Sequence, residues 1–289
     1  MAQLTSVPRN NERIGLRHIE AAVMSETALD EKMARDYEAV AEPLTLQYIA
    51  TAFALVGGVG PGTRVLDVAA GTGGLSVSAA EAGAQVLATD KSVAMVARLS
   101  ERLEPYPNCV ARVMDGQALE SADGAFDATF SMFGVVNFPD WRLGLRELAR
   151  VTRRGGHGCV SAWCDPRAAG PVGFLFEALR ATFPDVDLPP PSEGVTLLGS
   201  PDSLREEMTA AGFKDVEVLT VDAIWTSPSV DAFLTERDQL YGIMPMYATL
   251  PQAYRDRLLP ALRRAAEGTG ADGAVQVKAG GLIAAGRVN

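Results

Sequence analysis

The sequence has few of the residues that build metal sites, disulfide frameworks and membrane spans. It contains only three cysteines and two histidines in 289 residues, and no two cysteines have the C-x-x-C spacing of zinc and redox sites. We therefore expect no metal and three reduced, mostly apolar cysteines. No run reaches the ~18–20 apolar residues that span a bilayer, and the first twenty residues lack the apolar core of a signal peptide. These absences predict a cytoplasmic protein with no membrane span.

Positive charge is also scarce. Lys and Arg number 26 against 36 Asp and Glu, which gives a net charge of −10. Five arginines form the main cationic cluster, and four of them recur at helical spacing, as on a solvated helix face: Arg142, Arg146, Arg150, Arg153 and Arg154. Because nucleic-acid binders depend on clustered cations, we expect no nucleic-acid partner. The oligomeric state stays open.

Apolar runs of strand character alternate with helical segments through the middle of the chain. The expected strands are 64–69, 85–89, 109–113, 126–132, 157–163, 216–225 and 275–288. The helices expected between the first five strands are 75–82, 92–103 and 141–151, with Arg102 facing outward. This alternation predicts a parallel sheet that is covered on both faces.

Helical material flanks and interrupts this sheet. The predicted division is an N-terminal helical cap over 1–45, a core over 46–165, a lid insertion over 166–199, and the end of the core sheet over 200–289 with a helical insertion at 228–272. Pro43 breaks the helical pattern of the cap.

The strongest local signal is the segment VLDVAAGTGG, which begins at Val65. A buried strand here runs into a glycine turn that opens a helix. Glycines let the backbone approach a ligand, and a helix N-terminus offers free N–H groups. On its own the turn is weak support for a binding site, because many strand-to-helix turns use glycine for geometry alone.

Three acids strengthen this interpretation. Asp67 lies in the first apolar run, and Asp90 and Asp115 follow the next two, where open α/β sheets bind their ligands. Asp90 is placed to accept the hydroxyls of a ribose. A dinucleotide site would explain Asp90, but the charge of Asp67 would oppose a pyrophosphate, and Ser76 occupies the place of the third glycine of G-x-G-x-x-G. A ligand that carries an ammonium group fits better.

In this order the motifs resemble those of class I S-adenosylmethionine-dependent methyltransferases, in the group that includes ubiquinone/menaquinone-type C-methyltransferases. The resemblance covers roughly 35–165 and is carried by VLDVAAGTGG, VLATDKS, MDGQAL, FDATFSMFGVVNF and ELARVTRRGGHGCVSAW. It implies an α/β fold with a seven-stranded Rossmann-like methyltransferase sheet, its last strand antiparallel, and helical lid insertions. It also implies S-adenosyl-L-methionine as cofactor and S-adenosyl-L-homocysteine as product.

The resemblance assigns the cofactor-binding residues. Asp67 and the glycine turn would hold the amino-acid end, Asp90 the ribose, and the turn at Asp115 the adenine. The full set implied is Tyr37, Asp67, Gly71, Thr72, Gly73, Asp90, Lys91, Ser92, Met95, Asp115, Gly116, Gln117, Ser131 and Met132.

A methyl acceptor would bind beside the fourth and fifth strands. Methyl transfer from a sulfonium is an in-line displacement that a dry, apolar site favours. The candidate acceptor pocket consists of Phe133, Asn137, Trp163, Tyr241 and Met244. The candidates for a catalytic group are His18, Tyr37 and Ser131, whereas His157 lies at the start of the fifth strand, at the wrong end of the sheet, and is expected to be structural.

The leading hypothesis is methyl transfer to a small-molecule metabolite. The Asn/Asp-Pro-Pro-Tyr/Phe motif of amide N-methyltransferases that act on DNA or protein is missing after the fourth strand. The alternative is a protein that binds the cofactor without methyl transfer, either cyclase- or isomerase-like or a regulatory binding module. A nicotinamide-dependent dehydrogenase is a third option. The sequence leaves open whether the acceptor atom is O, N or C.

Overall fold

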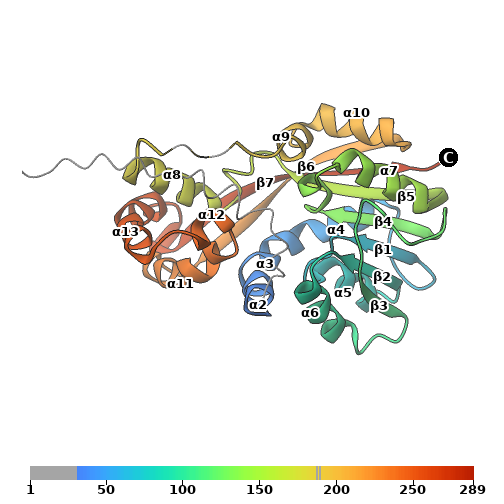
Figure 1. Ribbon diagram of the computed structural model, residues 1–289, viewed down its shortest axis with the longest axis horizontal. Helices are drawn as coiled ribbons and strands as arrows, with labels where there is room; N and C mark the ends of the chain where they lie inside the picture. Colours follow the sequence, from blue (N-terminus) through green and yellow to red (C-terminus); the bar gives the residue numbers. More distant parts are fainter. Residues whose placement is uncertain (1–30, 187, 189) are drawn as a thin grey trace, which may run out of the picture.

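A seven-stranded sheet forms the centre of the protein (Figure 1). The computed structural model describes residues 31–186, 188 and 190–289. The strands lie in the order β3-β2-β1-β4-β5-β7-β6. Their bounds are β1 Arg64–Val68, β2 Gln85–Asp90, β3 Cys109–Val113, β4 Phe126–Met132, β5 Thr152–Trp163, β6 Lys214–Ser227 and β7 Val275–Arg287. Strands β1–β5 pair in parallel, and β7 is antiparallel to both β5 and β6. The predicted fold class is confirmed.

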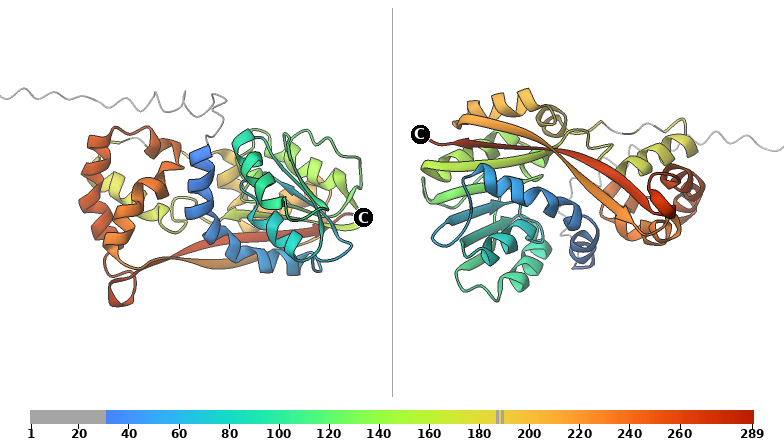
Figure 2. Two further views of the ribbon diagram at one scale, coloured as in Figure 1. Left: turned by 90° about the horizontal axis from the view of Figure 1, so that it is seen from below. Right: turned by 180° about the vertical axis from the view of Figure 1, so that it is seen from behind.

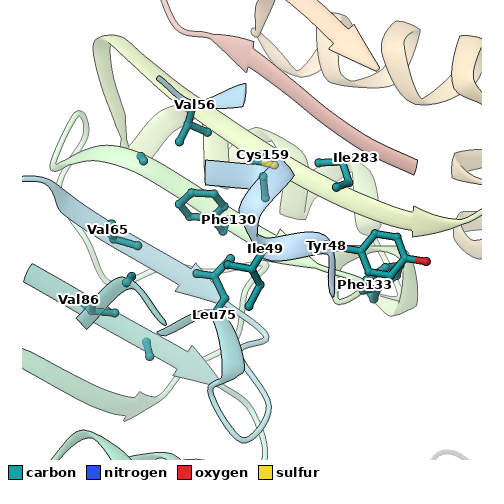
Figure 3. Packing of buried hydrophobic residues seen from close by; sticks show 14 of the residues in the cluster. Tyr48, Ile49, Val56, Val65, Leu75, Val86, Phe130, Phe133, Cys159 and Ile283 are labelled. Carbon is teal, nitrogen blue, oxygen red and sulfur yellow. The ribbon is translucent and has the colours of Figure 1, made fainter. Parts of the chain in front are cut away.

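Helices cover both faces of this sheet. One face packs against α4 (Ile49–Leu55), α5 (Gly74–Glu81) and α6 (Val93–Leu103), the other against α7 (Trp141–Val151) and α10 (Pro201–Ala211). Successive strand residues point to opposite faces, so Val65 joins one buried cluster and Leu66 the other. Figure 3 shows part of the first cluster around Phe130.

The N-terminal helices lie against the edge formed by the carboxyl ends of the strands. They are α2 (Glu31–Val40), α3 (Glu42–Thr45) and the 3₁₀ turn η2 (Leu46–Tyr48). Pro43 stands in the first turn of α3, where its missing N–H removes no helical hydrogen bond. The chain therefore breaks its helix at Ala41. Helix α2 contacts α6 of the core on one side and α11 (Val230–Gly242) on the other.

Strands β6 and β7 run on beyond their neighbours and carry a helical lobe (Figure 2). The lobe consists of α8 (Val172–Thr182), α11, α12 (Pro245–Ala248) and α13 (Gln252–Ala266), and it has its own buried cluster. The two insertions expected over 166–199 and 228–272 thus meet here, because α8 packs on α13. Helix α9 (Glu193–Leu198) instead packs on the 3₁₀ turn η3 (Val135–Asn137) of the core. The turn η4 (Ala271–Gly273) precedes β7.

Candidate cofactor and active site

The turn after β1 has a backbone that favours glycine. Gly71 and Gly73 have φ angles of 57° and 93°, in the left-handed region. A Cβ on Gly73 would lie 2.1 Å from Leu99, so no side chain fits there. A Cβ on Gly71 would lie 3.5 Å from the ring of Tyr37. Tyr37 therefore covers the turn, and α5 starts directly behind it.

Asp90 holds this turn from the neighbouring strand. Its carboxylate accepts hydrogen bonds from the N–H of Gly71 (3.0 Å) and the N–H of Ser92 (2.9 Å). Ser92 in turn caps α6 by accepting from the N–H of Met95 (3.3 Å). Burial raises the pKa of Asp90. The ends of β1 and β2 are therefore joined through one carboxylate, in the position that the sequence predicted for a ribose-binding acid.

Asp67 lies below the turn. It is 2% exposed and accepts a hydrogen bond from the Ser76 hydroxyl (2.7 Å). Burial, together with the charge of Asp90, raises the pKa of Asp67 to about 7. Burial and the charges of Glu42, Asp90 and Asp67 raise the pKa of Tyr37 to about 12. The site thus carries a negative potential that a bound cation would relieve.

The turn after β3 is braced from two sides. Asp115 is exposed and accepts from the backbone N–H (2.8 Å) and the side-chain amide (3.2 Å) of Gln117. The Gln117 Oε1 accepts from the N–H of Asp140 (2.8 Å). A Cβ on Gly116 would lie 2.6 Å from Phe138, so only glycine fits. Asp115, Gly116 and Gln117 thus form a fixed turn at the carboxyl end of β3.

Three other members of the predicted cofactor set lie at the same sheet edge. Lys91 is exposed immediately after β2, and Met95 is buried in the first turn of α6. Met132 ends β4 and is half-buried against the cluster of Figure 3.

Ser131 has a structural role. It is fully buried, its hydroxyl donates to the carbonyl of Val68 (2.9 Å) and it accepts from the N–H of Val135 (2.9 Å). The hydroxyl therefore ties β4 to β1 and fixes the turn that follows. This corrects the expectation that Ser131 is a candidate catalytic group.

An aromatic cluster follows the ends of β4 and β5. Phe133 stacks on Trp163, with ring centroids 4.0 Å apart, and meets Tyr48 edge-on at 5.0 Å; Figure 3 shows Phe133 beside Tyr48. Phe133 has a left-handed φ of 57° and its N–H donates to Ser161. The exposed Asn137 donates its amide to the carbonyl of Phe133 (2.9 Å). A non-glycine residue held in this conformation is a mark of functional sites.

Two of the predicted pocket residues belong elsewhere. Tyr241 is fully buried in the core of the lobe, where its hydroxyl donates to the carbonyl of Pro171 (2.8 Å). Met244 is half-buried and packs against the same cluster. The structure thus corrects their assignment to a pocket with Phe133, because helical spacing cannot distinguish a pocket wall from a lobe core. His18 lies outside the described residues. His157 pairs with Arg287, away from the carboxyl edge.

A buried ion pair behind the glycine turn was not predicted from the sequence. Glu42 on α3 is 5% exposed, accepts from the Thr72 hydroxyl (2.7 Å), and binds Arg102 through both carboxylate oxygens. Arg102 therefore faces inward rather than outward. One signal was present: Glu38 and Glu42 on one helical segment and Arg98 and Arg102 on another are both four residues apart.

Four of the five arginines of α7 and the start of β5 pair with acids, among them Arg146 with Asp140 (4.0 Å). Arg142 binds Glu207 and Glu193, Arg150 binds Glu147 and Asp123, and Arg153 binds Asp127.

Within residues 31–186, 188 and 190–289, no group of His, Cys, Asp or Glu is placed to hold a metal ion. Among the helices in this part of the chain, none has the length and apolar character needed to cross a bilayer.

A parallel α/β sheet with a glycine turn after β1, an acid after β2 and an antiparallel last strand defines the class I S-adenosylmethionine-dependent methyltransferase fold. Residues 65–156 match a family described as a methyltransferase domain. Demethylmenaquinone methyltransferase of Corynebacterium urealyticum is 35% identical over 165 residues, which are 54% of this chain and 70% of that protein. The chain belongs to the class I S-adenosylmethionine-dependent methyltransferases, in the group that contains the quinone-type enzymes, and its cofactor is S-adenosylmethionine.

Other relatives are matched over a smaller share of their length. An uncharacterized protein of Mycobacterium tuberculosis is 36% identical over 46% of this chain and 48% of its own length. Demethylmenaquinone methyltransferase of Corynebacterium efficiens is 42% identical over 37% of this chain and 44% of its own length. The chain spans about half the length of these relatives.

Solved structures share the fold. A putative methyltransferase from an antibiotic biosynthesis pathway of Anabaena variabilis aligns with a TM-score of 0.57 and 15% identity, over 82% of this chain and 96% of that one. The YcgJ protein of Bacillus subtilis aligns with a TM-score of 0.53 and 17% identity, over 85% and 98%.

Proposed function

We propose that this chain transfers the methyl group of S-adenosylmethionine to a small, planar, largely apolar acceptor that binds at Phe133 and Trp163. The observation that carries the proposal is the carboxylate of Asp90, which is held between the N–H groups of Gly71 and Ser92 under the cover of Tyr37. This places a fixed acid beside the glycine turn.

The residues at this edge fit the chemistry of the cofactor. When bound, S-adenosylmethionine supplies a methyl group activated on a sulfonium. Asp90 would accept the ribose hydroxyls, and the turn of Asp115, Gly116 and Gln117 would receive the adenine. Burial raises the pKa values of Asp67 and Asp90, even with Lys91 beside Asp90, and the positive charge of the cofactor would stabilise both carboxylates. The rest of the cofactor would contact four further residues, Lys91, Ser92, Met95 and Met132.

The acceptor would stack at the aromatic cluster. Phe133 and Trp163 are stacked and are held by Tyr48 and Ser161, and Phe133 belongs to the buried cluster of the sheet. They would form a rigid apolar wall against which an acceptor is shielded from water. Such a wall favours a reaction in which charge is neutralised. The name of the relatives in Corynebacterium indicates a quinone-type acceptor for those enzymes, and a planar acceptor of this kind fits the wall.

The described residues offer no ready general base at the aromatic wall. Tyr37 keeps its proton because its pKa is raised to about 12. Ser131 uses its hydroxyl in structural hydrogen bonds, and Asp67 is enclosed below the turn. We therefore propose an acceptor atom that is already nucleophilic at neutral pH, in a small metabolite of the cytoplasm rather than in nucleic acid.

Calorimetry with S-adenosylmethionine and S-adenosylhomocysteine tests the cofactor site. We expect the wild-type protein to bind both and the Asp90→Ala variant to lose at least tenfold in affinity. Failure of the wild-type protein to bind, or full retention of affinity by Asp90→Ala, contradicts the proposal.

Transfer is tested with isotopically methyl-labelled cofactor and a metabolite extract. We expect label to appear in one small apolar product. An intact cofactor site with no labelled product would favour a cofactor-binding protein without methyl transfer, and a rise in melting temperature with NAD alone would favour a dehydrogenase.

A further inference from the structure

We propose that Glu42 is a positioning residue for the methyltransferase cofactor site. It fixes the conformation of the glycine turn through Thr72 and Arg102, from the side of the turn that faces away from the cofactor. The inference rests on the cofactor site of the proposed function. Glu42 lies on α3, which is not part of the sheet domain's strand–helix repeat, and the motifs of the turn gave no reason to expect it.

The contacts of Glu42 converge on one residue of the turn. Thr72 donates its hydroxyl to Glu42 Oε2 (2.7 Å), and its carbonyl accepts from Arg102 Nη1 (2.8 Å). Arg102 in turn donates from Nη1 to Glu42 Oε2 (2.7 Å) and from Nη2 to Oε1 (2.8 Å). Thr72 is therefore held by its side chain and its backbone at once, by a bidentate pair whose geometry is rigid.

The pair is enclosed. The side chain of Glu42 is 7% exposed and that of Arg102 is 18% exposed, and Thr72 is fully buried. Solvent screens such enclosed hydrogen bonds only weakly. Removing either charged partner would leave the other as a buried charge without a counter-charge. The conformation of the glycine turn thus depends on the buried Glu42–Arg102 pair, which is stronger than an ion pair on the surface.

Side-chain packing also restrains the glycine turn next to Glu42. A Cβ on Gly74 would lie 3.0 Å from Cγ and Cδ of Glu42, and one on Gly73 would lie 2.1 Å from Leu99. Glu42 therefore contacts the first residue of α5, a helix that has no side-chain cap. A carboxylate near a helix N-terminus interacts favourably with its exposed N–H groups and dipole. The turn is thus held between α3 and α6.

The chain offers a matched control one helical turn away. Arg98 on α6 donates from Nε (2.6 Å) and Nη2 (3.0 Å) to the carboxylate of Glu38 on α2. This pair also joins the N-terminal helices to α6. Glu38 approaches Arg102 Nε at 3.7 Å, without the bidentate hydrogen bonds that Glu42 makes to Arg102, and the Glu38–Arg98 pair does not contact Thr72. If docking of the N-terminal helices were all that mattered, loss of either pair would have the same effect on the cofactor.

The test compares Glu42→Gln with Glu38→Gln. We expect Glu42→Gln to raise the Kd and KM for S-adenosylmethionine at least tenfold, with kcat at saturating cofactor changed less than threefold. Glu38→Gln should change the Kd less than twofold. Glu42→Asp, which keeps the charge but withdraws it from Thr72, should fall between Glu42→Gln and the wild-type protein.

A variant that keeps the ion pair covers the case in which Glu42→Gln does not fold. Thr72→Val removes only the hydroxyl donor, and we expect it to raise the Kd for the cofactor at least threefold, whereas Thr72→Ser should bind as the wild-type protein does. Equal effects of Glu42→Gln and Glu38→Gln, or wild-type affinity in both Glu42→Gln and Thr72→Val, overturn the inference. If the wild-type protein itself does not bind the cofactor, the proposed function fails instead.

Discussion

Asp67 lowers the stability of the free protein at neutral pH, while its negative charge favours binding of the cofactor. In the unfolded chain this acid loses its proton near pH 4, but in the folded protein burial holds its pKa at about 7. Between these values the folded state binds the extra proton, so the stability of the free protein falls as pH rises from about 4 to 7. We predict that Asp67→Asn, which can still accept from Ser76, raises the melting temperature of the free protein at pH 8 by ~3 °C or more, and that the gain shrinks toward pH 4. Thermal unfolding over this range measures it.

The same variant should bind the cofactor at least tenfold more weakly at pH 8, because the negative charge that favours a cationic ligand is gone. Asp115→Asn is the control for stability, since Asp115 is exposed and its replacement should leave the melting temperature within ~1 °C. A melting temperature of Asp67→Asn that is lower than that of the wild-type protein at pH 8 would contradict this account.

Ala69 and Phe133 hold left-handed backbone conformations at the ends of β1 and β4, with φ of 57° at both. This conformation costs a residue with a Cβ about 1–2 kcal/mol. We predict that Ala69→Gly is tolerated, with a free energy of unfolding within ~1 kcal/mol of the wild-type value. Ala69→Val should lower the free energy of unfolding by ~2 kcal/mol or more, because its branched side chain would be strained in this conformation. It would also crowd Gly134, since a Cβ placed on Gly134 would lie 2.6 Å from the Cβ of Ala69. Denaturant unfolding of the two variants measures the difference, and equal stability of both would show that the strain is absent.

At the scale of elements, strands bounded by clear turns could be predicted from the sequence. The bounds of β3, β4 and α7 agree at both ends with the prediction. Polar residues precede β3 and α7, namely Asn108 and Asp140, and Asp140 caps α7. Strand β5 begins at Thr152 rather than at 157. Gly155 and Gly156 lie within the strand, where an irregularity in the pairing with β4 accommodates the extra residues.

The site was predictable where chain order determines position. Asp90 and Asp115 follow successive parallel strands, so the topology brings them to one edge of the sheet. The contacts of Glu42 with Arg102 depend on how two helices far apart in sequence dock, and periodicity does not contain that information. For the same reason Tyr241 could not be assigned to the lobe core, because its spacing is common to a pocket wall and a buried helix face.

Gln47 joins the N-terminal helices to the sheet in the manner of a strand. Its side-chain amide donates to the carbonyl of Ile224 (2.9 Å) and accepts from the N–H of Ile224 (2.9 Å), on the edge strand β6. We predict that Gln47→Ala lowers the free energy of unfolding by ~1–2 kcal/mol, because both backbone groups lose a partner. Gln47→Glu should be worse at neutral pH, since a carboxylate cannot donate to the carbonyl. Denaturant unfolding tests this, and Gln252→Ala on the exposed side of α13 provides a control that should stay within ~0.5 kcal/mol.

The described residues form a core on the sheet, with one apolar cluster on each face, and a core in the lobe; β6, β7 and α2 connect the two (Figure 2). Leu262 of α13 is fully buried in the lobe cluster, and Leu145 of α7 is fully buried against the sheet. A Leu→Ala change at such a position costs about 2–5 kcal/mol through lost burial and a residual cavity. Because the glycine turn and Asp90 belong to the sheet, damage to the lobe should leave the cofactor site intact.

We therefore predict that Leu262→Ala speeds proteolytic cleavage within 228–272 at least fivefold, while its Kd for S-adenosylmethionine stays within twofold of the wild-type value. Leu145→Ala should show the reverse pattern, with weaker cofactor binding and an unchanged cleavage rate in the lobe. Calorimetry and limited proteolysis on the same samples measure both quantities. A fivefold loss of cofactor affinity in Leu262→Ala would mean that α2, which contacts both α6 and α11, transmits the state of the lobe to the cofactor site, and the two cores would then act as one cooperative unit.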